Sequence, residues 1–246
     1  MSDRAPRLSA GTGGRAPAKL RAAKLRASGL LALFGCLCLA PAAGAYAADG
    51  VHANPGPSSL ARPAFAEQLQ AARTAYFADL EGDRGADDRA RQQFAALHAA
   101  WPGQPVVEAY LGSLELLESG RTLAVWRKHT LAQEGLEKLD SAVSQAPDSL
   151  EARFVRALTT WHLPFFFHRK EQAEQDLGFL APRAEQAAHQ GSLPAPLAAA
   201  ALDYWGQVLA DRGAQATIQA RQAFEAAVRV APSSPAAEDA RKRLAR

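Results

Sequence analysis

The sequence contains little cysteine, and the apolar run near its start is short. Two of its 246 residues are cysteine, and both lie before residue 40. Residues 30–40 form an apolar run of 11 residues, whereas about 20 are needed to span a hydrocarbon layer of ~30 Å. This run therefore does not predict a transmembrane helix.

Residues 1–47 have the composition of a secretory signal. Basic residues dominate the first part, the apolar run follows, and small residues precede the expected cleavage site after Ala47. This order is typical of signal peptides. We therefore expect an exported protein, periplasmic or extracellular. A lipoprotein signal is the alternative, since Leu33-Phe34-Gly35-Cys36 resembles a lipobox in which Cys36 would carry the lipid.

Removal of this segment changes what the cysteines and the charge imply. Cys36 and Cys38 leave with it, which excludes a disulfide scaffold, a cysteine nucleophile and a thiolate metal site. Seven of the 28 basic residues and one of the 25 acidic residues also leave, so 21 basic and 24 acidic residues remain, a formal net charge of −3. The basic pI of the whole chain is thus no argument for binding nucleic acid, and we expect no such partner.

The remaining chain has no run of alternating β-branched residues, and its apolar residues recur with helical spacing. Residues 48–61 are rich in proline, glycine and serine and predict a flexible linker before a folded part at residues 62–246. One apolar stripe comprises Phe65, Leu69, Ala72, Tyr76 and Leu80. Another comprises Leu150, Phe154, Ala157, Leu158 and Trp161, after Asp148 and Glu151 in the positions of a capping pair. The sequence predicts an all-α fold.

A short pattern that ends in proline recurs three times. A small or apolar residue is followed by apolar residues four and seven positions later and by proline five positions after that: Ala90, Phe94, Leu97, Pro102; Gly135, Leu139, Ala142, Pro147; Ala220, Phe224, Ala227, Pro232. This spacing resembles the second helix of a tetratricopeptide repeat (TPR). Tyr110-Leu111-Gly112 and Trp205-Gly206 resemble positions of the first helix, with the second match displaced by one or two residues. The chain is similar to exported bacterial TPR-like proteins of uncharacterised function.

The resemblance implies a right-handed solenoid of antiparallel helix pairs in which neighbouring pairs share one core. We expect about four pairs, at residues 62–101, 105–146, 148–190 and 193–231, and a capping helix at 235–245. Family members bind peptides or protein segments on a concave surface lined by the first helices. The resemblance therefore implies a non-catalytic interaction or scaffold module that needs no cofactor and binds a protein or peptide of the cell envelope.

Several residues are candidates for contact with that partner. Three consecutive phenylalanines follow Pro164, and they either form an exposed contact for a partner or a membrane surface, or plug a joint between helix pairs. Arg153 and Arg156, three positions apart on one helix face, either hold a carboxylate or are solvated. The full set of expected contact residues is Tyr110, Trp126, Arg153, Arg156, Phe165, Phe166, Phe167 and Trp205.

The alternative is an accessory subunit or enzyme with a metal or hydrolytic site near His162 and His168. With Glu171 or Glu174, these imidazoles offer ligand types that suit zinc. The two histidines are separated by a helix-breaking proline, however, so their spacing defines no ligand geometry. We also find no phosphate-binding glycine loop outside the signal segment and no serine-nucleophile motif. We therefore expect neither a metal nor catalysis.

Overall fold

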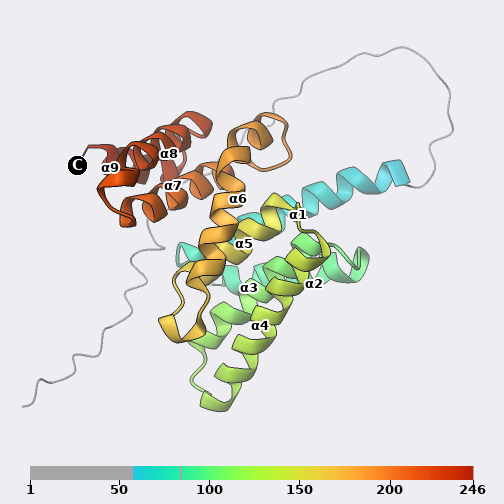
Figure 1. Ribbon diagram of the computed structural model, residues 1–246. Helices are drawn as coiled ribbons and strands as arrows, with labels where there is room; N and C mark the ends of the chain where they lie inside the picture. Colours follow the sequence, from blue (N-terminus) through green and yellow to red (C-terminus); the bar gives the residue numbers. More distant parts are fainter. Residues whose placement is uncertain (1–57, 84, 246) are drawn as a thin grey trace, which may run out of the picture.

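The structure, a computed structural model, describes residues 58–83 and 85–245, and this part of the chain consists of helices joined by turns and loops, without strands. The expected signal segment, Cys36 and most of the expected linker lie outside these residues. The described residues form nine α-helices, labelled in Figure 1, and two short 3₁₀ helices: α1 (Ser58–Leu80), α2 (Ala86–Ala100), α3 (Pro105–Arg121), α4 (Val125–Gln145), α5 (Leu150–Trp161), η2 (Phe165–Phe167), α6 (Lys170–His189), α7 (Ala195–Asp211), η3 (Ala214–Ala216), α8 (Thr217–Val230) and α9 (Pro235–Leu244). The prediction of an all-α fold is confirmed. The first helix begins at Ser58, inside the range expected to be linker.

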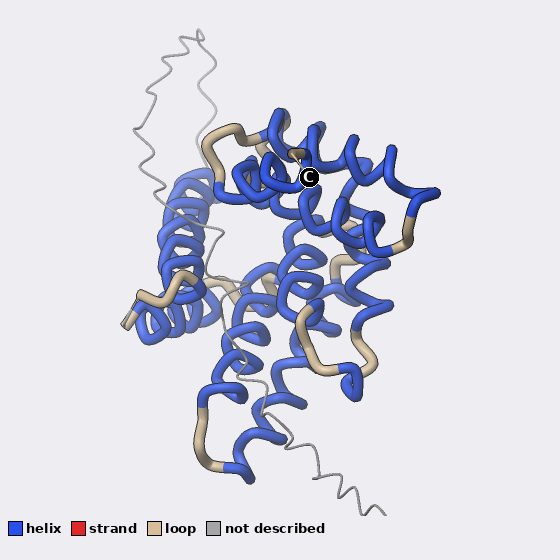
Figure 2. Tube along the Cα trace, turned by 90° about the vertical axis from the view of Figure 1, so that its left-hand side faces the viewer, coloured by secondary structure: helices blue, strands red, loops and turns tan. Residues whose placement is uncertain are grey.

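Helices that follow one another along the chain pack against one another. Packing is extensive within α1/α2, α3/α4 and α7/α8, α6 packs on α7 at least as extensively as on α5, and α9 packs on α8. Contacts between alternate helices, α3 with α5 and α7 with α9, join neighbouring pairs. Figure 1 shows the resulting run of helices, from α1–α4 through α5 and α6 to α7–α9, and Figure 2 shows the same helices from the side. No helix in the described residues is both long and apolar enough to cross a bilayer.

The recurring sequence pattern corresponds to a recurring local structure. Its small and apolar positions in α2, α4 and α8 are all buried. The residue before each proline ends its helix with nearly the same backbone angles: Trp101 (φ −134°, ψ 76°), Ala146 (−135°, 75°) and Ala231 (−143°, 77°). Proline disfavours the α region for the residue before it, which accounts for all three helix ends.

Serines cap two of the helices that follow these prolines. The Ser149 hydroxyl accepts a hydrogen bond from the Ala152 amide at 3.3 Å, and Ser234 accepts one from the Ala237 amide at 3.2 Å. These bonds satisfy amides that have no partner within the helix. The expected cap of α5 at Asp148 is therefore wrong by one residue, and Glu151 has another role in the core.

Candidate interaction surface

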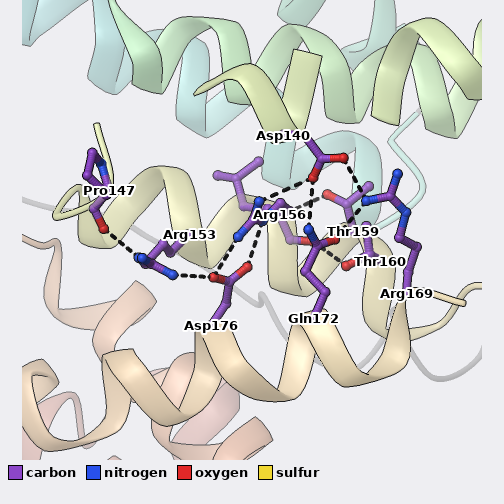
Figure 3. Close-up of polar contacts among 10 residues, drawn as sticks. Asp140, Pro147, Arg153, Arg156, Thr159, Thr160, Arg169, Gln172 and Asp176 are labelled. Atoms are coloured by element: carbon purple, nitrogen blue, oxygen red, sulfur yellow. Dashed lines mark hydrogen bonds and ion pairs between the residues drawn. The ribbon is translucent and has the colours of Figure 1, made fainter. Parts of the chain in front are cut away.

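A network of charged side chains ties α4, α5 and α6 together, with Asp176 at its centre (Figure 3). The Asp176 side chain is inaccessible to solvent. Arg156 donates to it from Nε at 2.7 Å and from Nη2 at 2.9 Å, in a two-pronged arrangement. Arg153 donates to the same carboxylate from Nη1 at 2.7 Å. Asp176 on α6 is therefore held by two arginines of α5.

The network continues to α4 through Asp140. Its carboxylate accepts from Arg156 Nη1 at 3.2 Å, from Arg169 Nη1 at 2.7 Å and from the amide of Gln172 at 3.0 Å. Burial lowers the pKa of Arg156, but its hydrogen bonds and proximity to Asp176 and Asp140 outweigh that effect and raise the pKa overall. Arg156 is therefore a permanent cation shared by two helices that flank its own.

The sequence left open whether Arg153 and Arg156 hold a carboxylate or are solvated, and these contacts show which they do. Both arginines hold a carboxylate, as guanidinium groups do well, but the carboxylate belongs to the same chain. Arg153 is further engaged with the Pro147 carbonyl, to which its Nε donates at 2.6 Å, and its guanidinium lies 4.2 Å from the centre of the Phe179 ring. The two side chains hold the α4–α5–α6 joint together.

Tyr110 is likewise used inside the molecule. Its ring is buried, stacks on Phe94 with centroids 4.5 Å apart, and meets Tyr76 edge-on. Its hydroxyl donates to Glu151 at 2.9 Å, and the same carboxylate forms an ion pair with Arg73. Burial, followed by the charge of Glu151, raises the pKa of Tyr110. The side chain offers no accessible surface to a partner.

The three phenylalanines after Pro164 divide between solvent and core. They form the 3₁₀ turn η2, closed by hydrogen bonds from the Phe167 amide to the Pro164 carbonyl (2.9 Å) and from the His168 amide to the Phe165 carbonyl (3.0 Å). Phe165 is 87% exposed and Phe166 61%, whereas Phe167 packs against the core. Phe165 and Phe166 thus fit the interpretation as an exposed contact, whereas Phe167 fits the interpretation as a residue that plugs a joint.

The turn leads directly into the charged network. His168 has a left-handed backbone (φ 51°), and the next residue, Arg169, forms the ion pair with Asp140. The rings of Phe166 and Phe167 lie 4.9 Å apart, so the exposed ring rests on the partly buried one. Phe165 and Phe166 are therefore exposed on a fixed turn.

His162 and His168, the histidines of the alternative metal site, contact different parts of the structure. His162 Nε2 lies 3.5 Å from the Tyr204 hydroxyl, and His168 caps the 3₁₀ turn. Within residues 58–83 and 85–245, no group of three or more histidine, cysteine, aspartate or glutamate side chains could hold a metal ion.

Trp205, another expected contact residue, is half-buried, and its ring lies against Gly178 of α6 and under Arg212.

A second exposed apolar cluster occurs at the turn between α3 and α4. Leu123 is 94% exposed, Val125 73% and Trp126 79%. Only Trp126 was expected from the sequence. The other two could have been found from the run Leu123-Ala124-Val125-Trp126, in which four apolar residues follow one another.

A hollow of about 400 Å³ lies on the C-terminal part of the molecule, lined by Trp161, Gln207, Ala210, Asp211, Phe224 and Arg243. Beside it, Asp203 is 1% exposed and accepts hydrogen bonds from Gln207 Nε2 at 2.9 Å and Arg243 Nη1 at 3.2 Å. Burial raises the pKa of Asp203 to about 7, although Arg243 opposes the shift. Spacing along the chain did not indicate this carboxyl, because Arg243 lies 40 residues further along.

Among the expected contact residues, the structure leaves Trp126, Phe165 and Phe166 exposed and uses Tyr110, Arg153 and Arg156 within the fold. The two exposed clusters are the candidate interaction surfaces. Comparisons with models of known families, with curated proteins and with solved structures found no match to this chain.

Proposed function

We propose that the chain is a TPR-like interaction module whose helix pairs form a solenoid that holds a partner segment. The recurring buried positions of α2, α4 and α8, and the common geometry of the helix ends before Pro102, Pro147 and Pro232, support a repeated unit. The contacts between alternate helices support stacking of successive pairs. The module is non-catalytic and works without a cofactor.

The main observation in support of a binding role is that Phe165 and Phe166 are exposed on a turn that hydrogen bonds hold in place. Exposed aromatic side chains on a rigid support bind with little loss of conformational freedom, which is a property of interaction hot spots. Phe167 and the Arg169–Asp140 ion pair provide that support. The proposed partner is an apolar segment of another protein of the cell envelope.

Capture of partners from an envelope extract tests this proposal. Wild-type protein and the Phe166→Asp variant are immobilised at equal amounts, and bound proteins are identified by mass spectrometry. Ile218→Asp is the matched control, because Ile218 is 73% exposed on α8 and lies outside both exposed clusters. We expect a protein that is captured by wild type and by the control and is lost from Phe166→Asp.

Circular dichroism of each variant shows whether the helical content is preserved. A folded Phe166→Asp variant that captures the same proteins as wild type, in the same amounts, would overturn the role of the aromatic turn. A loss of the same protein from Ile218→Asp would show that capture depends on apolar surface in general.

A further inference from the structure

The turn between α3 and α4 combines exposed apolar side chains with an excess of positive charge. The 15 residues between Glu118 and Glu134 contain no acid and include Arg121, Arg127, Lys128 and His129. We call Leu123, Val125, Trp126, Arg127 and Lys128 the hairpin tip. All five side chains are exposed.

The cations of the hairpin tip differ from the arginine at its base. Arg121 forms ion pairs with Asp79 at 2.8 Å and with Asp87 at 3.1 Å, which fasten the end of α3 to the first helix pair. In the part of the chain that the structure describes, no ion pair joins Arg127 or Lys128 to an acid. Their charge therefore remains available to a partner.

The position of the hairpin tip suits a broad, flat partner. In Figure 1 the α3–α4 turn is the lowest point of the described chain, and Figure 2 shows it projecting at the same end. The hollow of about 400 Å³ described above does not include its apolar side chains. Docking on a lipid surface requires no pocket.

We propose that the hairpin tip docks on an anionic lipid surface, with Leu123, Val125 and Trp126 inserted among the headgroups and Arg127 and Lys128 on the lipid phosphates. Tryptophan favours the membrane interface because its ring is apolar with one polar edge. Basic residues beside it add attraction to anionic lipid. The first turn of α4 also contains no acidic residue that would oppose an anion at the positive end of the helix. This proposal is independent of the role of Phe166.

Partitioning of the protein onto lipid vesicles tests the proposal that the hairpin tip docks on anionic lipid. The protein is used as it is recovered from the producing cell, and its N-terminus is determined by mass spectrometry. Vesicles of phosphatidylcholine alone are compared with vesicles that also contain phosphatidylglycerol. We expect wild type to prefer the anionic vesicles. Neutralising Arg127→Gln and Lys128→Gln together should weaken that partitioning by about 25-fold, since each basic residue near an anionic surface contributes about a factor of five.

A local probe separates the hairpin tip from any binding by the N-terminal segment, which all variants share. Trp126 is 79% exposed, whereas the other three tryptophans are partly buried. Brominated lipids should quench the fluorescence of wild type, and the Trp126→Phe variant should lose that quenching while it remains bound. Trp126→Glu places an acid in the hairpin tip, and Ile218→Glu is its control because it places the same acid elsewhere on the surface. Ile218→Glu should leave partitioning unchanged.

Three results would overturn the proposal: equal quenching of wild type and Trp126→Phe, unchanged partitioning of the double glutamine variant, or equal binding to both kinds of vesicle. Should Trp126→Glu reduce capture of an envelope protein without changing partitioning, the hairpin tip would be a protein contact instead. Loss of partner capture by Phe166→Asp with normal partitioning would separate the two surfaces.

Discussion

Gly112 of α3 and Gly135 of α4 lie directly against each other. A Cβ atom on Gly112 would come within 2.7 Å of the Gly135 carbonyl oxygen, and one on Gly135 within 2.6 Å of the Gly112 carbonyl oxygen. The obstructing atoms belong to the backbone, so no side chain can move aside. The close packing of this helix pair depends on the absence of side chains at both positions.

Gly112→Ala should therefore destabilise the protein by about 1–3 kcal/mol, the usual cost of overpacking a core. Gly120→Ala in the same helix is the matched control, because nothing lies within 4 Å of its added Cβ. The control should stabilise the helix by about 0.5–1 kcal/mol, since alanine is the better helix former. Urea denaturation of both variants measures the difference, and equal effects of the two substitutions would contradict the packing.

The Arg156–Asp176 pair should be costly to break. Replacing Asp176 with asparagine keeps the shape of the side chain but leaves Arg153 and Arg156 without their buried counter-charge. We expect a loss of about 3–5 kcal/mol in the free energy of unfolding. The isosteric control is Glu225→Gln in the exposed pair with Arg221, where the change should stay within about 1 kcal/mol. A small loss for Asp176→Asn would mean that the buried network contributes little.

Asp203 should make stability depend on pH in the direction opposite to most carboxyl groups. Burial raises its pKa from 3.8 to about 7 in the folded protein. Between these values the folded state binds the proton more tightly than the unfolded state, so the contribution of Asp203 to stability is greatest below pH 4. It is lost as the pH rises to about 7, with a slope of up to about 1.4 kcal/mol per pH unit.

Thermal or urea unfolding of wild type and Asp203→Asn at a series of pH values measures this contribution. The stability of wild type relative to the variant should fall from pH 4 to pH 7 and be constant above that range. A difference that is independent of pH would contradict the raised pKa. Glu225→Gln, at an exposed carboxylate, serves as the control.

Gly206 on α7 and Phe224 on α8 form a second close contact. A Cβ atom on Gly206 would lie 2.6 Å from Phe224 Cδ1, so Gly206→Ala should destabilise the protein by about 1–3 kcal/mol. Here the obstacle is a side chain, and the smaller Phe224→Leu should relieve it. We expect the double variant to be more stable than the sum of the two single effects predicts, as a double-mutant cycle would show. Additive effects would indicate that the two residues do not contact each other.

Local sequence features predicted the helices well. Leu69, Ala72, Tyr76 and Leu80 of the first apolar stripe are buried as expected, because one face of an amphipathic helix must turn inward whatever it packs against. The helix ends before Pro102, Pro147 and Pro232 were equally predictable, since proline restricts its neighbour in any context.

The partners of polar residues could not be predicted in the same way. Arg156 binds an aspartate 20 residues ahead, and Tyr110 donates to a glutamate 41 residues ahead. Those pairings depend on how the helices cross and on the turns between them, and neither is encoded in the spacing along one helix. The same uncertainty made Tyr110 and Arg156 candidates for a surface in which they take no part.

The amino-acid sequence by itself determined the helix ends before Pro102, Pro147 and Pro232 and which helix faces turn inward, because proline and periodicity act over a few residues. Only the tertiary structure decided which charges and aromatic rings are used inside the molecule and which remain exposed. That decision depends on contacts between distant segments, and it places Asp176 against Arg153 and Arg156 while Phe165, Phe166 and Trp126 stay in solvent.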